Sequence, residues 1–168
     1  LQMPVKGCKD LYASLDEYVK EETLDGDNQY QSERYGKQDA KKGVSFKSLP
    51  PVLELHLRRF EYDFATDAMA KINERFEFPT TLDLDRDGRK YLTDDADTSI
   101  VNVYRLHSVL VHSGGPNGGH YYAFIRPLGS NDWFRFDDER VTKAKEKEAT
   151  EGQFGGHEHQ TPPGHTPQ

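Results

Sequence analysis

The sequence places one histidine and one aspartate where they could act together as a base and its orienting carboxylate. His120 follows the glycine-rich segment GGPNGG and begins the strand-like segment HYYAFIR. The segment DWFRFDD is also strand-like, and residues 127–130, between the two segments, favour a turn. A hairpin turning at these four residues puts His120 directly opposite Asp137.

That placement matters because directly opposed residues of an antiparallel pair have Cβ atoms about 4.5–5.5 Å apart. An imidazole N–H then reaches the carboxylate, which fixes the tautomer and stabilises the imidazolium, as in a nucleophile–base–carboxylate triad. Asp138 points to the opposite face unless a bulge shifts the register by one residue, so Asp137 is the preferred partner. A surface ion pair without a catalytic role is the more common arrangement for two such residues, and the glycine-rich segment before His120 strengthens the catalytic alternative.

Composition limits the class of protein. With 168 residues, 34% of them hydrophobic, the chain suggests one domain or a large piece of one. Its net charge of −7 disfavours a chain-wide basic surface for nucleic acid, and it has no run of about 18 apolar residues that would span a membrane. A single cysteine excludes an intrachain disulfide framework and a multi-cysteine zinc site. We therefore expect a soluble intracellular protein with a protein partner.

Hydrophobic periodicity predicts a helix near the start of the chain. Asp10 is a suitable N-cap, and apolar residues recur at helical spacing from Leu11 to Val19. This helix is expected to end near Leu24. Residues 25–42 are polar and have no sustained period, which predicts turns and an exposed hairpin.

Most of the remaining chain alternates in the manner of strands. The segment VLELHLRRF, residues 52–60, puts three leucines on one face, so one face is expected to be buried. A polar connection is predicted for residues 61–73, and the strongest strand is predicted over residues 103–113. Further strands are expected at residues 76–78, 82–84, 120–126 and 132–138, and a helix with almost no apolar stripe at 143–151.

Two other clusters could suggest a metal ion. His157, Glu158, His159 and His165 lie in a terminal stretch rich in proline and glycine, without rigid spacing. The acidic loop 83–97 lacks the twelve-residue calcium pattern with a closing glutamate. We therefore expect no metal, a solvated acidic loop, and a disordered tail over residues 157–168.

Several ordered blocks resemble the ubiquitin-specific protease family of cysteine deubiquitinases. They are SLPPVLELHLRRFEYD, KINERFEFP, YRLHSVLVHSGGPNGGHYYAFIRP and WFRFDDERV, in the order of the family, within a likeness over roughly residues 4–156. The resemblance implies an α+β fold with a mainly antiparallel sheet and a few short helices. This would be the palm and part of the fingers of a papain-like cysteine protease domain, with residues 1–156 as its C-terminal half.

The resemblance also implies roles for individual residues. His120 matches the general base of a Cys-His-Asp triad, Asp137 its orienting carboxylate, and Asp138 a second aspartate that assists. The connection 61–73 and the glycine loop 114–119 match two loops that frame the channel for the C-terminus of ubiquitin. The implied substrate-binding residues are Phe60, Gly114, Gly118, Gly119 and Tyr121, although Phe60 and Tyr121 could equally be core aromatics.

The sequence departs from the family pattern at its cysteines. It has no early cysteine box, and Cys8 in VKGCKD matches the middle of the family domain, so we interpret it as structural or exposed. The implied enzyme is a thiol-dependent ubiquitinyl hydrolase of which this chain supplies the His/Asp half. The isolated chain is then expected to be inactive, and the alternative is a non-catalytic ubiquitin-binding or decoy fragment.

The same comparison sets the expected partners. Many members of the family bind zinc through two Cys-x-x-Cys pairs, but the matching stretch here is SERY, residues 32–35, which supplies no thiolate. No cofactor is expected. Ubiquitin, ubiquitinated proteins and the missing N-terminal half of the catalytic domain are the implied partners, with neither nucleic acid nor membrane, and the implied locations are the nucleus and cytoplasm.

Overall fold

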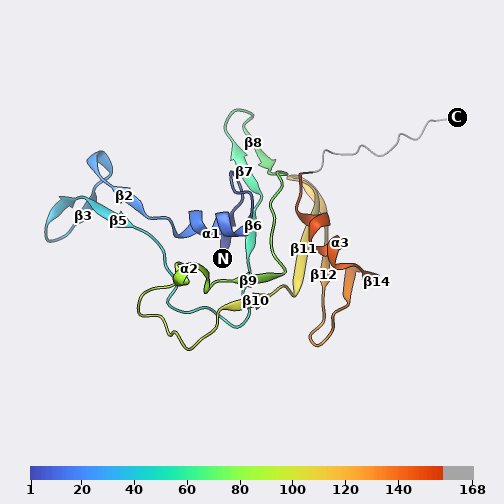
Figure 1. Ribbon diagram of the computed structural model, residues 1–168. Coiled ribbons are helices and arrows are strands. Elements are labelled where there is room, and N and C mark those ends of the chain that lie inside the picture. Colours follow the sequence, from blue (N-terminus) through green and yellow to red (C-terminus); the bar gives the residue numbers. More distant parts are fainter. Residues whose placement is uncertain (157–168) are drawn as a thin grey trace.

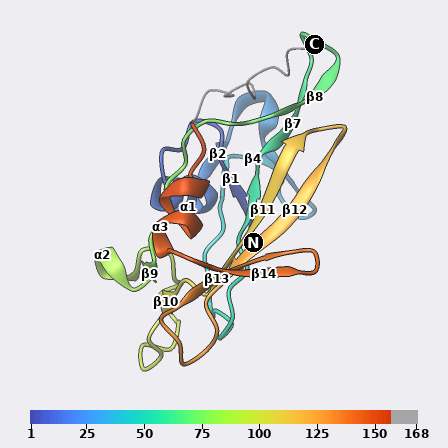
Figure 2. The ribbon, with the colours of Figure 1, turned by 90° about the vertical axis from the view of Figure 1, so that its right-hand side faces the viewer.

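The computed structural model describes residues 1–156 (Figure 1). His120 and Asp137 lie on a four-stranded antiparallel sheet. The predicted tail, including the histidines and glutamate of residues 157–165, lies outside the described residues. The strands are β11 (Ser108–Gly115), β12 (Gly118–Ile125), β13 (Trp133–Asp137) and β14 (Arg140–Ala144), hydrogen-bonded in that order. The strands predicted over residues 120–126 and 132–138 are thus confirmed. In Figure 2, the β11–β12 hairpin extends well beyond β13 and β14.

One face of this sheet is buried where a short helix covers it. Phe124 and Trp133 pack with Ala149 of the short helix α3 (Glu146–Ala149), which is followed by the 3-10 turn η2 (Glu151–Gln153). The predicted helix over 143–151 is therefore shorter than expected, because residues up to Ala144 pair as β14. On the other face, the side chains of Leu110 and Val141 remain exposed.

A second core surrounds the helix α1 (Leu11–Val19), which contributes Leu11 and Leu15. The predicted cap is confirmed, since the Asp10 carboxylate accepts a hydrogen bond of 2.8 Å from the Ala13 backbone N–H. The predicted end near Leu24 is wrong. The helix ends at Val19 because the following residues pair in a strand instead.

That pairing builds the exposed arm at the left of Figure 1. Strand β2 (Glu22–Leu24) pairs with β5 (Ala40–Lys42), and beyond the turn η1 (Gly26–Asn28) β3 (Tyr30–Ser32) pairs with β4 (Gly36–Gln38). No residue of the arm is buried, which confirms the turns and exposed hairpin expected for residues 25–42.

The start of the chain and a segment from its first half form the one parallel pair of strands among the described residues. Strand β1 (Gln2–Pro4) runs parallel to β6 (His56–Arg58), and the alternating leucines before and within β6 pack against the core of α1. The expected one-sided burial of residues 52–60 is confirmed, although only three of these residues lie in β6. Because the other strand pairs in residues 1–156 are antiparallel, the fold is α+β with mainly antiparallel sheet, as predicted.

The polar connection predicted for residues 61–73 is wrong. These residues form the hairpin of β7 (Phe60–Asp63) and β8 (Ala68–Lys71). Its turn is built by the Asp63 carboxylate, which accepts hydrogen bonds of 2.9 Å from the Ala65 N–H and the Thr66 hydroxyl. The alternation of Phe60 and Tyr62 with Glu61 and Asp63 in β7 is the strand signal that the prediction missed, and no residue of the hairpin is fully buried.

The strand predicted over residues 103–113 is divided. Its first part, β10 (Val103–Arg105), pairs with β9 (Thr81–Asp83), and β11 joins the four-stranded sheet. At the break the Leu106 N–H donates to Thr80 and the Arg126 side chain donates to the Leu106 carbonyl, so the chain changes sheets there. The strand predicted at 76–78 is reduced to one bridge between Glu77 and Asp10, and the acidic loop contains the short helix α2 (Arg86–Arg89).

Within the described residues no helix has the length and apolar character needed to span a membrane.

Candidate active site

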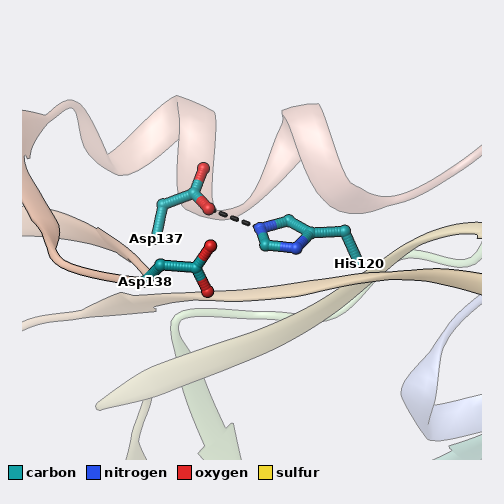
Figure 3. A group of neighbouring side chains, drawn as sticks. All are labelled: His120, Asp137 and Asp138. Atoms are coloured by element: carbon teal, nitrogen blue, oxygen red, sulfur yellow. Dashed lines mark hydrogen bonds and ion pairs between the residues drawn. The ribbon is translucent and has the colours of Figure 1, made fainter.

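The imidazole of His120 and the carboxylate of Asp137 are hydrogen-bonded. His120 lies near the start of β12 and Asp137 ends β13, and the distance from Nε2 to Oδ1 is 2.5 Å (Figure 3). The side chain of His120 is 48% exposed and that of Asp137 28% exposed. The structure therefore brings together the two residues that the sequence singled out.

The way in which they meet differs from the prediction. Strand β12 pairs with β13 in a register that puts Ala123 opposite Phe136, which is two residues away from the predicted pairing. The turn forms where expected, with the Ser130 N–H donating to Pro127, but residues 131 and 132 add length before β13 begins. A shift of two preserves the face on which each side chain lies. His120 therefore reaches Asp137 diagonally along the same face, rather than directly across the pair.

The hydrogen bond defines which nitrogen of His120 can accept a proton. A carboxylate ionised at neutral pH only accepts, so Nε2 must carry the hydrogen that it donates to Asp137. In a neutral imidazole the other nitrogen, Nδ1, then holds the lone pair. His120 thus has the arrangement of a general base with Nδ1 as its basic atom.

The electrostatics favour the charged form of both groups. The hydrogen bond to Asp137, with the charges of Asp137 and Asp138, raises the pKa of His120, against opposing contributions from desolvation and Arg135. The hydrogen bond to His120 is the main cause that lowers the pKa of Asp137, with Arg135 adding to it. A proton that arrives on His120 is therefore stabilised without being passed to Asp137.

Asp138 lies beside His120 and Asp137 for a reason that differs from the one predicted. It was expected to point away unless a bulge intervened, but β13 and β14 are joined without one, with Asp137 opposite Arg140. Asp138 is the first residue of the intervening turn and has a left-handed backbone with φ of 50°. One ligand atom from each of His120, Asp137 and Asp138 lies within 4.8 Å of the others, as Figure 3 shows for the three side chains.

Two side chains that the sequence interpretation missed support this pair. Arg135 Nη2 donates to Asp137 Oδ2 at 2.6 Å, and the guanidinium lies 4.1 Å from the centre of the Tyr122 ring. The Tyr122 ring in turn stacks loosely on His120, with centroids 6.5 Å apart. Alternation would have found both, because Arg135 is two residues from Asp137 and Tyr122 two residues from His120 on their strands.

One imidazole and two carboxylates also form a donor set for a divalent cation. Both oxygens of Asp137 are already engaged, however, Oδ1 by His120 and Oδ2 by Arg135. The positive charge of Arg135 beside the carboxylate disfavours a further cation. The arrangement suits proton transfer better than metal binding.

The glycines before His120 form a tight hairpin and not the loop predicted for residues 114–119. Gly115 pairs with Gly118 and Gly114 with Gly119, so only two residues form the turn. A Cβ at Gly114 would lie 2.7 Å from the Gly118 carbonyl oxygen, and Gly114 has a φ of 122°. A Cβ at Gly119 would collide with the His112 ring and the Ser113 carbonyl, whereas one at Gly118 would meet no atom within 4 Å.

The predicted aromatic residues gather around His112 on the other face of the hairpin. The His112 ring lies 4.6 Å from Tyr121 and 5.6 Å from Phe60, measured between centroids. Lys71 of β8 donates to the carbonyls of His112 and Gly114, at 2.9 and 2.8 Å, which ties the two hairpins together. Phe60 is half-buried and Tyr121 is 59% exposed, so the exposed ring of Tyr121 is available to a ligand.

Cys8, the only cysteine of the sequence, is outside this group. It is half-buried and packs against the core of α1, as the structural interpretation predicted. Desolvation, with the nearby charges of Glu17 and Asp10, raises its pKa. A nucleophilic thiol needs the opposite shift, because the thiolate is the reactive form.

Known proteins resemble the chain over most of its length. A sequence model described as ubiquitin carboxyl-terminal hydrolase matches residues 9–161. Ubiquitin C-terminal hydrolase 12 of Arabidopsis thaliana is 64% identical over 166 residues, which cover 98% of this chain and 15% of that protein. Ubiquitin carboxyl-terminal hydrolase 15 of Schizosaccharomyces pombe is 51% identical over 156 residues, 93% of this chain and 14% of that protein. The chain thus spans about a seventh of the length of these relatives.

Solved structures agree in fold. The SAGA Ubp8/Sgf11/Sus1/Sgf73 DUB module bound to ubiquitin aldehyde superposes with a TM-score of 0.75 and 30% identity, over 92% of this chain and 34% of that chain. A mutant form of the same module, with a shortened Sgf11, gives a TM-score of 0.72 and 31% identity, over 92% and 33%. Sequence and fold agree with the resemblance noted above, and the chain belongs to the ubiquitin carboxyl-terminal hydrolase family of deubiquitinating proteases.

Proposed function

We propose that this chain supplies the general base and the orienting carboxylate of a ubiquitin-specific cysteine protease. The reaction is hydrolysis of the isopeptide or peptide bond after the C-terminal glycine of ubiquitin. The observation that carries the proposal is the 2.5 Å contact between His120 Nε2 and Asp137 Oδ1, which leaves Nδ1 to accept a proton. The ubiquitin aldehyde bound to the similar Ubp8 module supports ubiquitin as the partner.

In the first step, Nδ1 of His120 takes the proton of a cysteine thiol, and the sulfur attacks the carbonyl carbon of the scissile bond. The imidazolium then gives that proton to the departing amine as the tetrahedral intermediate collapses to a thioester. A water molecule, deprotonated by the same nitrogen, hydrolyses the thioester and releases the carboxylate of ubiquitin and the thiol. Asp137 stabilises the imidazolium in both steps, and Asp138 adds negative charge nearby.

The nucleophile is proposed to come from a part of the protein outside these 168 residues. Cys8 packs against the core of α1, and its raised pKa keeps the thiol protonated. The matched relatives are about seven times longer than the matched stretch, which leaves ample chain to supply a cysteine. The isolated chain is therefore proposed to be inactive, with the remaining half of the catalytic domain as its partner.

The C-terminal Gly-Gly of ubiquitin is proposed to lie along the glycine hairpin. Gly118 is two residues before His120 on β12, so both belong to the same face of the strand. The space beside Gly118 is open. Gly114 and Gly119 hold the hairpin closed, and Tyr121 and Phe60 line the opposite face.

A chimera tests this proposal in a complete protein. In the Arabidopsis chimera, this chain replaces the 166 matched residues of ubiquitin C-terminal hydrolase 12, to which it is 64% identical. The substrate is ubiquitin with a fluorogenic amide on its C-terminal glycine. We expect the chimera to turn over and His120→Ala to lower kcat to the background, a loss on the order of 10⁶-fold for a member of such a unit. Turnover that survives His120→Ala would reject His120 as the base. Cysteine-dependent turnover by the isolated chain would reject the proposal that the nucleophile lies outside these 168 residues.

A non-catalytic ubiquitin-binding fragment is the second candidate, favoured by the packing of the single thiol against the core of α1. Titration of the chain with labelled ubiquitin, and with ubiquitin lacking its terminal Gly-Gly, distinguishes the two. Saturable binding that needs the Gly-Gly, together with an inactive chimera, would support the fragment.

A further inference from the structure

The carboxylate of Asp137 is shared between two positively charged or protonated groups. Its Oδ1 accepts from His120 Nε2 at 2.5 Å and its Oδ2 accepts from Arg135 Nη2 at 2.6 Å. Arg135 and Asp137 are two residues apart on β13, so their side chains leave the same face of the strand. With each oxygen bound to a different donor, rotation of the carboxylate away from the imidazole would break both hydrogen bonds.

The position of Arg135 is itself fixed by an aromatic ring. Its guanidinium lies 4.1 Å from the centre of the Tyr122 ring, and the Tyr122 ring is stacked at 27° to the plane of His120. Arg135 Nε is buried and has no hydrogen-bond partner among the described residues. An unsatisfied buried donor is costly, so the guanidinium holds a place that is favourable for Asp137 and Tyr122 rather than for its own hydrogen bonds.

Without this arginine, the carboxylate of Asp137 would have a second orientation available, pointing toward solvent. An open hollow lies beside it, lined by Arg135, Asp137, Arg140 and Thr142. If Arg135 were removed, Oδ2 would face this hollow, and the carboxylate could rotate toward water. Arg140 lies opposite Asp137 in the β13–β14 pair, but within the described residues it makes no ion pair with that carboxylate.

We propose that Arg135 is a positioning residue for the reaction, which holds Asp137 Oδ1 toward His120 and supports the Tyr122 ring beside the imidazole. This inference rests on the proposed function, since it assigns a task within the same site. Arg135 acts through Asp137 and Tyr122 and need not contact the substrate. Lysine is a poor substitute because an ammonium cannot lie flat on the ring while it binds the carboxylate.

Arg135 also affects the protonation of the base. The charged groups near His120 are Asp137 and Asp138, which raise its pKa, and Arg135, which lowers it. Glu139 in the β13–β14 turn and Arg140 on the adjoining strand β14 are the other charged residues at this end of the sheet within the part of the chain that the structure describes. Removal of the Arg135 charge alone would raise the pKa of His120, but if Asp137 also turns away, its hydrogen bond, the largest contribution, is lost and the pKa of His120 falls.

The test uses the Arabidopsis chimera with Arg135→Met, which keeps an unbranched stem but removes the charge and the hydrogen-bond donors of the guanidinium. We expect kcat to fall roughly 10- to 100-fold from misplacement of the catalytic pair, with KM within about twofold. Because the hydrogen bond to Asp137 is the largest cause of the raised pKa of His120, its loss should move the acidic limb of the pH profile of kcat/KM to lower pH. Arg135→Lys should leave that limb close to its original position but recover only part of kcat. Arg140→Met is the matched control, since it removes an arginine beside the same hollow and should leave both readouts unchanged.

The outcomes separate this inference from the proposed function. If kcat of Arg135→Met stays within about twofold, or falls while the acidic limb stays in place or moves to higher pH, Arg135 is not a positioning residue. A loss confined to KM overturns the inference as well. If Arg135→Met does not fold, Arg135→Lys provides the test. A partial loss of kcat in Arg135→Lys supports the inference, and full activity overturns it, because the planar guanidinium is then not needed. Persistence of activity in His120→Ala would instead reject the proposed function.

Discussion

Two neighbouring glycines should respond to alanine in opposite ways. At Gly119 an added Cβ would collide with the His112 ring and with the Ser113 carbonyl. At Gly118 the same atom would meet nothing within 4 Å. The Gly118 side of β12 is also the His120 side, whereas Gly119 shares its face with Tyr121.

The structural cost follows from these contacts. The backbone oxygen of Ser113 cannot move without disturbing the β11–β12 pairing, so Gly119→Ala should cost about 1–3 kcal/mol, as overpacking does elsewhere. For a chain of this size that lowers Tm by roughly 2–12 °C. Gly118→Ala should change the free energy of unfolding by less than about 1 kcal/mol, the ordinary difference in backbone freedom.

Turnover should respond in the opposite way, because Gly118→Ala is expected to lower activity although it leaves the fold stable. In the Arabidopsis chimera, Gly118→Ala places a methyl group on the His120 face, where the ubiquitin C-terminus is proposed to lie. We expect kcat/KM to fall by about tenfold or more, as crowding of 1–2 kcal/mol would cause, while thermal unfolding of the 168-residue chain with the same change stays normal. Normal turnover of Gly118→Ala would refute the proposed path of the substrate, and a stable Gly119→Ala would refute the packing argument.

Three further predictions concern the catalytic pair and the thiol. In the chimera, Asp137→Asn should lower kcat by roughly 10²–10⁴-fold, because the imidazole loses its orienting charge, whereas Asp138→Asn should cost only a few-fold; equal effects in steady-state kinetics would contradict the assignment of Asp137. The raised pKa of His120 means that the pair stabilises the fold fully below the ordinary pKa of histidine, about 6.5, and that this contribution is lost as pH rises through the folded-state pKa. Because the pKa of Asp137 is lowered, its contribution is lost only at acidic pH, so urea denaturation should show a larger penalty for His120→Ala near pH 6 than near pH 9. Cys8→Ser should leave turnover of the chimera unchanged; loss of activity without loss of folding would point to Cys8 as the nucleophile.

The site could be anticipated from the sequence because its determinants are local. Strand alternation and a recognisable turn are enough to put His120 and Asp137 on one face. The predicted pairing was wrong by two residues, since nothing in the sequence shows that residues 131 and 132 extend the connection before β13. The contact survives because a shift of two residues preserves the face and the imidazole reaches diagonally.

Other features depend on contacts between residues that are far apart in the sequence, which the local pattern does not show. The end of the helix at Val19 is set by pairing of β2 with β5, some twenty residues later. In the β7–β8 hairpin, the alternation of Phe60 and Tyr62 with Glu61 and Asp63 is short and has no counterpart in β8, so the turn built by Asp63 is the other local signal. Lys71 ties this hairpin to the glycine hairpin. No signal in the sequence indicates this, because Lys71 donates to the backbone carbonyls of His112 and Gly114, which come near it only in the folded chain.

The protonation state of the His120 ring tests the central claim most directly. Nitrogen NMR of the imidazole in the 168-residue chain, above the pKa of His120, distinguishes the two neutral tautomers. We predict hydrogen on Nε2, a free lone pair on Nδ1, and a lower pKa of His120 when Asp137 is changed to asparagine. Hydrogen on Nδ1, or a pKa that Asp137→Asn does not move, would contradict the assignment of His120 as a base held by Asp137.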